Sequence, residues 1–313
     1  MDNFAGLLDA PRARGAFTLR TVMRSPWSLR IEAESPITLI AGVSGTLWVV
    51  PDAGDPVQVG PGDIALTRAP DHYNVSETPS SPPQVIILPG QDCRNLAGES
   101  VKEEMMHGVR TWGNEPDGST VFLVGAYEGL SDISDRLLHS LPPVLSLGRA
   151  EWDSPLISLL SDEVVCERPG QAAVLDRLLD LLLTAVLRAW FAKEDAKGPA
   201  WWRSQSDPVV DRALKLMHEN PAHHWTLDVL ASKAGASRAS FARRFNELVG
   251  ETPMTFLKNW RLAIAADLLC QPGETIGTVA EKVGYSSPYA FSTAFKRVRG
   301  ISPKEHREQA TLS

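Results

Sequence analysis

The sequence predicts a multidomain protein in which an all-β barrel is followed by a helical segment and then by an all-α domain of two tandem helix-turn-helix units. Three observations predict this fold class. Short β-branched and aromatic runs alternate with turn residues up to about residue 126. The apolar residues then recur at helical spacing. The last hundred residues contain an internal repeat. A chain of 313 residues has room for two domains.

The first part of the chain carries the strand pattern. The runs that are typical of strands cover residues 37–40, 46–50, 63–66, 85–88 and 121–124. Turn-forming Gly, Pro and Asp residues separate these runs, as in Gly60-Pro-Gly-Asp. Many short strands at this spacing favour a barrel or a sandwich over a parallel sheet with crossover helices. We therefore expect one all-β domain over residues 1–150.

A helical segment is expected over residues 151–195. Its longest helix covers residues 172–191, where Asp176, Asp180, Thr184 and Arg188 form one narrow polar stripe. Most of the remaining surface is Leu, Val and Ala, which is wider than one core contact needs. Two interpretations stay open: burial against both the barrel and a second subunit, or burial wholly within one chain. Residues 196–207, with Lys197-Gly-Pro, are expected to be a linker.

The internal repeat defines the C-terminal domain, which we place at residues 208–309. Equivalent residues stand fifty positions apart: Phe245 and Phe295, Gly250 and Gly300, Pro253 and Pro303. Three such pairs in one register make a chance match improbable. The two helix-turn-helix units are expected at about 226–249 and 275–299, joined by a long helix over residues 253–270.

Each unit has the residues that a helix-turn-helix needs. The small residues Ala231 and Ala280 allow the two helices of a unit to cross closely. A glycine in the turn adopts positive φ, a serine caps the second helix, and a glycine ends it. The residues expected in these three roles are Gly235 and Gly284, Ser237 and Ser287, and Gly250 and Gly300. The inward faces are expected to carry Phe241, Phe245 and Leu248 in the first copy and Phe291, Phe295 and Val298 in the second.

The charge of the chain is unevenly distributed. Its net charge is −7, but residues 208–313 contain 14 Lys and Arg against 10 Asp and Glu. The remaining residues then contain 17 basic and 28 acidic side chains. A basic C-terminal part on an acidic N-terminal part is compatible with a nucleic-acid partner, although a net of +4 is weak evidence by itself.

These residues carry a family resemblance. Residues 208–307 resemble the AraC/XylS DNA-binding domain, most clearly in Ile276-Gly-Thr-Val-Ala-Glu-Lys-Val-Gly-Tyr-Ser-Ser. Trp27-Ser-Leu-Arg-Ile, Gly62-Asp-Ile-Ala-Leu and His72 are similar to the cupin-type sensor domain that precedes it in many bacterial regulators. The resemblance implies a cupin-like sensor barrel joined to a reader of double-stranded DNA. The expected partners are therefore a small-molecule effector and RNA polymerase, and the wide apolar face of residues 172–191 predicts a homodimer.

The second helix of each unit supplies the candidate DNA contacts. Exposed positions that could read bases are Ala239, Ala242, Arg243, Tyr289, Ser292 and Thr293. Basic residues that could contact phosphates are Arg238, Arg244, Lys296, Arg297 and Arg299. Arg243 is the strongest candidate because its planar guanidinium can bond guanine O6 and N7 together. For each of the others, a solvated surface role is an equal alternative.

Two kinds of signal could reach the barrel. A small organic effector could bind a pocket formed by Trp27, Trp48, His72 and Trp112, although core packing explains the tryptophans equally well. Alternatively, Cys93 could sense oxidants, because a neighbouring arginine lowers the pKa of a thiol. An unreactive Cys93 is the ordinary alternative to this second hypothesis.

Enzyme activity is not expected. His72, His107 and His139 are too scattered for a cupin metal site, so we predict no metal and no cofactor. A cupin-type enzyme fused to a DNA-binding domain is the least favoured interpretation. Residues 1–20 lack the pattern of a secretory signal, and the helix over 172–191 carries four charges, which excludes a membrane span. We expect a cytoplasmic protein.

Overall fold

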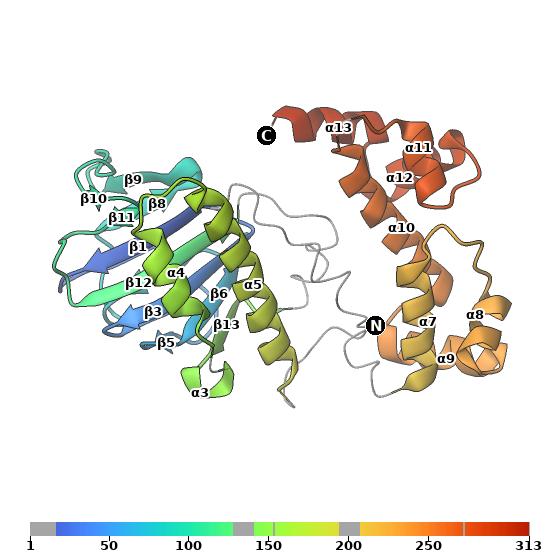
Figure 1. Cartoon of the computed structure of the whole chain (residues 1–313), viewed down its shortest axis with the longest axis horizontal. Helices are drawn as coiled ribbons and strands as arrows, with labels where there is room; N and C mark the ends of the chain where they lie inside the picture. Colours follow the sequence, from blue (N-terminus) through green and yellow to red (C-terminus); the bar gives the residue numbers. More distant parts are fainter. Residues whose placement is uncertain (1–16, 128–140, 153, 194–206, 272, 313) are drawn as a thin grey trace. The chain divides into compact units, whose positions relative to one another are not determined.

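The computed structural model describes residues 17–127, 141–152, 154–193, 207–271 and 273–312. The chain divides into two compact units. Described residues up to 193 belong to the first unit and those from 207 onward to the second (Figure 1). The described part of the segment predicted over 151–195 is thus in one unit with the strands. Residues 196–206 of the predicted linker lie outside the described residues.

Two sheets build the first unit. The larger sheet has the order β10-β11-β1-β12-β3-β6-β13, and the smaller has β5-β4-β7-β2-β8-β9. In chain order, the strands are β1 (Phe17–Met23), β2 (Ser28–Ile31), β3 (Ile37–Ser44), β4 (Leu47–Pro51), β5 (Val57–Val59), β6 (Ile64–Arg68), β7 (Tyr73–Ser76), β8 (Val85–Leu88), β9 (Asp92–Asn95), β10 (Met106–Gly108), β11 (Thr111–Trp112), β12 (Thr120–Tyr127) and β13 (Val144–Leu147), with the 3-10 turn η1 (Pro89–Gln91) before β9.

Strand β12 lies at the centre of the larger sheet. It pairs antiparallel with β1 and with β3 along nearly its whole length. The facing surfaces of the two sheets bury one apolar cluster that includes Trp27, Val49, Tyr73 and Phe122. Trp27 and Phe122 stack with their ring centroids 5.7 Å apart. The close pairing and this shared core explain why many short strands form one stable barrel.

Three helices follow the strands: α3 (Arg149–Trp152), α4 (Leu156–Val164) and α5 (Gln171–Phe191). Helices α4 and α5 pack on each other and on the larger sheet (Figure 1). At Gly125 of β12, a Cβ atom would overlap a methyl carbon of Leu179. The Tyr127 hydroxyl donates a hydrogen bond of 3.0 Å to the main-chain oxygen of Leu179. These two contacts fix α5 against β12.

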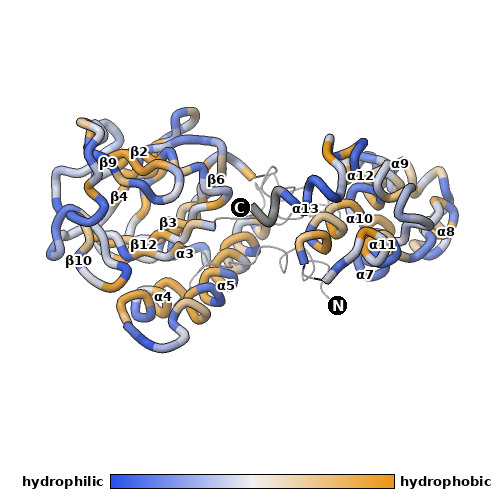
Figure 2. Tube along the Cα trace, turned by 90° about the horizontal axis from the view of Figure 1, so that it is seen from above, coloured by the Kyte–Doolittle hydropathy of each residue, from blue (hydrophilic) through white to orange (hydrophobic). Residues whose placement is uncertain are grey.

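The second unit is helical. Its helices are α7 (Pro208–Glu219), α8 (Leu227–Ala234), α9 (Arg238–Val249), α10 (Pro253–Leu269), α11 (Ile276–Lys282), α12 (Pro288–Arg299) and α13 (Pro303–Leu312). Helix α10 is the apolar centre of this unit, with more hydrophilic segments around it (Figure 2). One cluster packs Phe241 and Phe245 against Trp260, and a second packs Phe291 and Phe295 against Leu262 and Leu269. Each helix-turn-helix unit therefore has its own core, and both cores share α10.

Two contacts hold the helix-turn-helix units together. Arg261 of α10 donates hydrogen bonds of 2.7 and 2.8 Å to the main-chain oxygens of Pro221 and His223. In the same loop, Ala222 packs against Gly284, the turn glycine of the second unit. A Cβ at Gly284 would lie 2.5 Å from the Ala222 oxygen, so only glycine fits there. The separation of the two units is thus set by direct contacts in addition to α10.

The predicted fold class is confirmed: a sheet-rich first unit precedes a helical unit with two helix-turn-helix motifs. The expected turn and cap residues also behave as predicted, since Gly235, Gly250 and Gly300 have φ of 80°, 81° and 78°. Val298 is a correction. Helical spacing predicted it on the inward face, but it is 41% exposed, because it lies in the last turn of α12, beyond the buried Phe295.

The crowding at Gly284 gives a prediction with a matched control. Gly284 and Gly300 both have positive φ, at 76° and 78°, but nothing lies within 4 Å of a Cβ at Gly300. Gly300→Ala should therefore cost only the backbone term, about 1–2 kcal/mol. Gly284→Ala should cost roughly 1–3 kcal/mol more because the Ala222 main chain must move. Differential scanning calorimetry of the full chain measures both. Equal losses in the two variants would show that the Ala222 contact does not constrain the second unit.

Candidate nucleic-acid interface and ligand cavity

Helix α9 is the second helix of the first helix-turn-helix unit. The Ser237 hydroxyl accepts a hydrogen bond from the Ser240 amide and begins the helix, and Gly250 ends it. Phe241 and Phe245 are fully buried, which turns the opposite face outward. Of the predicted contact residues of α9, Arg238, Ala239 and Arg243 are exposed, whereas Ala242 and Arg244 are half-buried. At 3.6 residues per turn, Arg243 lies opposite the Phe241/Phe245 face, whereas Arg238 and Arg244 flank that face on its two sides.

Each arginine of α9 already has a carboxylate partner. Arg238 pairs with Asp228 at 3.1 Å and Arg244 with Asp207 at 3.6 Å. Arg243 bonds both carboxylate oxygens of Glu247 at 3.1 Å, one helical turn away. These partners were not predicted, although the i, i+4 spacing of Arg243 and Glu247 indicates such a pair. Exposed pairs of this kind contribute only about 0–1 kcal/mol, so a phosphate or a base edge can replace the carboxylate.

Helix α12 is the corresponding helix of the second unit. Ser287 caps its start, accepting from the Ala290 amide at 3.2 Å, and Pro288 occupies its first turn. Tyr289 is 83% exposed, a large apolar ring in water. Thr293, Lys296 and Arg297 are also exposed.

Two further candidates on α12 are half-buried. They are Ser292 and Arg299. The Arg299 guanidinium lies 6.0 Å from the centre of the Phe295 ring, so its position is partly fixed by packing.

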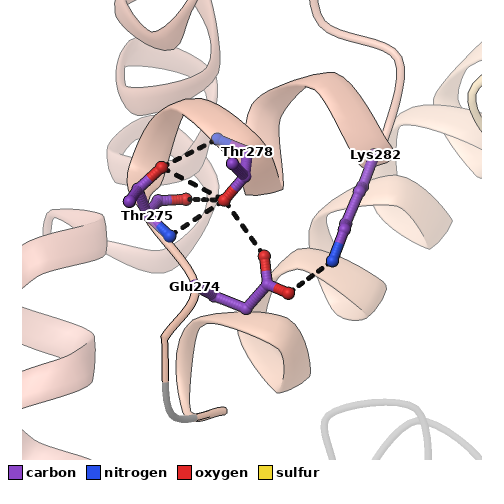
Figure 3. A network of polar contacts seen from close by, with 4 residues as sticks. All are labelled: Glu274, Thr275, Thr278 and Lys282. Carbon is purple, nitrogen blue, oxygen red and sulfur yellow. Dashed lines mark hydrogen bonds and ion pairs between the residues drawn. The ribbon is translucent and has the colours of Figure 1, made fainter.

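The helix that precedes α12 begins with a polar network (Figure 3). The Thr275 and Thr278 side chains each accept from the main chain of the other, which is a capping box with threonine in place of the usual Glu or Gln. Glu274 accepts from Thr278 at 3.0 Å and pairs closely with Lys282. The Lys282 ammonium, followed by the Thr278 hydroxyl, lowers the pKa of Glu274. This network was not predicted, because a capping box usually has Glu or Gln at the position that Thr278 occupies.

The first unit contains a cavity of about 240 Å³ between its two sheets. Its wall is mainly apolar and comes from both sheets, with Leu29, Ile40, Trp112, Phe122 and Val124 among its members. Cavities with apolar walls and a few polar groups are the usual form of small-molecule sites. The barrel therefore has an interior space that could hold an organic molecule.

The predicted pocket residues do not come together. Trp112 lines the cavity, but Trp27, Trp48 and His72 lie outside its lining. Trp27 is 1% exposed and stacks on Phe122 within the core. Trp48 is half-buried on β4, where its main chain pairs with Gln58 and Ser76. The main-chain oxygen of His72 accepts from the Asp52 amide. Those three residues were selected by type, whereas the lining depends on which face of each strand turns inward.

Cys93 is not a low-pKa thiol. It is 7% exposed and belongs to the cavity wall. Burial raises the pKa of its thiol to about 11, and nearby Lys102 only partly opposes that effect. Arg94, expected to activate the thiol, instead pairs with Asp92 at 2.7 Å. A thiol with a raised pKa carries less of the reactive thiolate at neutral pH. The redox hypothesis therefore loses the physical basis on which it was made.

Within the described part of the chain, no three or more His, Cys, Asp or Glu side chains gather in an arrangement that could hold a metal ion. No helix of that part combines the length and the apolar character that crossing a membrane requires.

The fold and the two exposed second helices define a DNA-binding transcription regulator. A cupin family model matches residues 2–192, and a helix-turn-helix domain model matches residues 230–309. The chain belongs to the AraC/XylS family of regulators, with an N-terminal cupin domain.

Curated relatives support this assignment. An AraC-like transcription regulator of Streptomyces lividans is 28% identical over 100% of both chains. The HTH-type transcriptional regulator AlkR of Acinetobacter baylyi is 34% identical over 62% of this chain and 65% of its own. Among solved structures, the DNA-binding domain of AdpA in complex with a target DNA is 30% identical over 34% of this chain and 95% of that domain, with a TM-score of 0.33.

The outer face of α9 leads to a prediction about DNA reading. Arg243→Ala should weaken binding to the specific site by about 1–3 kcal/mol and relax the preference at one base pair. Lys296→Ala, on α12, should weaken all sequences alike and lower the salt dependence by about one unit of slope. Binding titrations on the operator and on its single-base variants, at several salt concentrations, measure both effects. An unchanged base preference in Arg243→Ala would refute the assignment of Arg243.

Proposed function

We propose that the chain is an effector-responsive transcription regulator in which a small organic molecule binds inside the barrel and changes DNA binding. The observation that carries this proposal is the cavity of about 240 Å³ with a mainly apolar wall. Protein interiors are close-packed, and a void loses the van der Waals contacts that its lining side chains would otherwise make. A large apolar cavity is therefore typical of a ligand-binding site. The full-length relative from Streptomyces lividans is itself a transcription regulator, which favours a sensing role over catalysis.

In this proposal, α9 and α12 enter successive major grooves on one face of double-stranded DNA. Arg243 reads a base through its two parallel donors, with Ala239, Ala242, Tyr289, Ser292 and Thr293 as the remaining base-facing residues. Arg238, Arg244, Lys296, Arg297 and Arg299 contact phosphates. The support is the exposure of most of these side chains and the weakness of the ion pairs that occupy the α9 arginines. RNA polymerase is the expected protein partner at the promoter.

The same proposal includes a homodimer formed through α4 and α5. Large apolar side chains are exposed on this helix pair: Leu159 at 50%, Val174 at 45% and Leu181 at 53%. Val174 and Leu181 are two turns apart on one face of α5, while Leu175, Leu179 and Leu182 belong to its buried face. An apolar stripe of this kind on a helix, left in water, is typical of a helix–helix interface.

Filling the cavity tests the effector site. Ala126 lines the cavity from β12, so Ala126→Phe should occupy the space and abolish the response to the inducer while operator binding remains. Ala53→Phe, in the exposed turn between β4 and β5, is the matched control. The operator is obtained by sequencing genomic fragments that the purified protein captures, and the response is read from a reporter promoter in cells. A normal response in Ala126→Phe would exclude the cavity as the effector site.

Charging the exposed face of α5 tests the dimer. The double variant Val174→Asp, Leu181→Asp should be monomeric, because burying two carboxylates at an apolar interface costs several kcal/mol. Leu96→Asp is the control, since Leu96 is 69% exposed in the turn after β9. Light scattering of the full chain at tens of micromolar gives the mass of each. A wild-type monomer, or a double variant that stays dimeric, would contradict this part of the proposal.

A further inference from the structure

The inner wall of the cavity offers a ligand little polar recognition. Its deep members, such as Leu29, Ile40 and Phe122, are apolar and buried. Tyr73 and Thr38 also line it, but the Tyr73 hydroxyl already has hydrogen bonds with Thr38 and Thr67. The buried Trp112 indole N–H is an exception, because it lines the cavity and has no hydrogen-bond partner among the residues that the structure describes, so it can donate to a ligand oxygen. Along the apolar remainder of this wall, a polar group of a ligand would lose its water without gaining a partner, so the part of the ligand that lies there is expected to be apolar.

The exposed end of the cavity has the opposite character. Lys102 is exposed and Arg110 is half-buried, and both line the cavity, whereas no Asp or Glu is among the described residues that form the wall. Among the residues that the structure describes, neither cation has a recorded carboxylate partner. The one recorded acceptor for the Arg110 guanidinium is the main-chain oxygen of Thr18, at 3.3 Å. Most of its five N–H donors thus remain for another acceptor.

The backbone at this end is strained in a specific way. In the described part of the chain, the non-glycine residues with positive φ are Glu34, Gln91 and Arg110, at 54°, 62° and 46°. Gln91 and Arg110 line the cavity, and Glu34 stands between two lining residues, Ala33 and Ser35. Side chains other than glycine adopt this conformation at a cost, and such residues cluster at ligand-binding sites. Arg110 directly precedes β11, and Trp112 of that strand also lines the cavity.

We propose that the effector is a small amphipathic monoanion whose apolar body fills the cavity and whose carboxylate pairs with Lys102 and Arg110. The inference rests on the proposed function of the cavity as the effector site. The volume of about 240 Å³ equals that of roughly eight water molecules at about 30 Å³ each, which suits a medium-chain or simple aromatic acid. Arginine and lysine together give a carboxylate charge-assisted hydrogen bonds, and the apolar wall rejects a second charge.

Octanoate is a suitable probe, compared with 1-octanol and octylamine, which share its chain but not its charge. Titration calorimetry on the full chain should show octanoate binding most tightly and octylamine least. Lys102→Gln and Arg110→Gln should each weaken octanoate by roughly tenfold or more, while 1-octanol binding stays unchanged. Arg24→Gln is the control, because it also removes an arginine from the first unit. Arg24 is 57% exposed and does not line the cavity, so this variant should bind octanoate as the wild type does. Because Arg110 also binds Thr18, Lys102→Gln keeps the test valid if Arg110→Gln folds poorly.

The outcomes separate this inference from the proposed function. Equal binding of octanoate and 1-octanol, both lost in Ala126→Phe, would overturn the anion preference and leave the effector cavity intact. Octanoate binding that survives Ala126→Phe would overturn the cavity as the site, and this inference with it. Absence of octanoate binding at millimolar concentration, or an octanoate affinity unchanged in both Lys102→Gln and Arg110→Gln, would also overturn the inference.

Discussion

The packing of Leu179 on Gly125 is the contact on which the first unit depends. Gly125 lies on β12, and any side chain there would overlap Leu179, so α5 approaches the sheet as closely as a helix can. The Tyr127 hydroxyl, bonded to the Leu179 main chain, fixes the same turn of α5. Strand β12 also presents Phe122, Val124 and Ala126 to the cavity. Because successive side chains of a strand point to opposite faces, one strand separates the ligand space from the helix.

The second unit depends on an analogous close contact, between Gly284 and Ala222. Two helix-turn-helix units joined only by α10 could rotate about that helix, and their reading helices would then meet DNA at variable spacing. Arg261 bonds the loop around Ala222 from α10, and Gly284 packs on it from the second unit. Helix α10 and the turn before α12 are consequently held by contacts to one loop, which would reduce the conformational entropy lost on binding DNA.

The features that depend on residues close together in the sequence were predicted, whereas those that depend on contacts between distant residues were not. The capped helices α9 and α12 follow from a serine and a glycine that stand thirteen residues apart, so their positions were predictable. The cavity was not, because its wall combines residues as distant as Leu29 and Val124, and no local pattern tells which face of a strand turns inward. Trp27 illustrates the difficulty: its size suggested a ligand contact, but it stacks on Phe122 within the core. Lys102 and Arg110 gave no signal, since isolated basic residues are common in loops.

The position of the cavity against β12 limits how an effector can act. A ligand in the proposed site would contact Phe122, Val124 and Ala126. Because Gly125 packs tightly on Leu179, a shift of β12 would also move Leu179. An effector would change the balance between two arrangements of α5 only by the difference in its affinity for them. A deep apolar wall contributes affinity to both arrangements nearly equally, because its contacts are non-directional. The directional contacts proposed at the exposed end, at Lys102 and at Arg110, would be better suited to distinguish them. Arg110 directly precedes β11, which pairs with β1 next to β12.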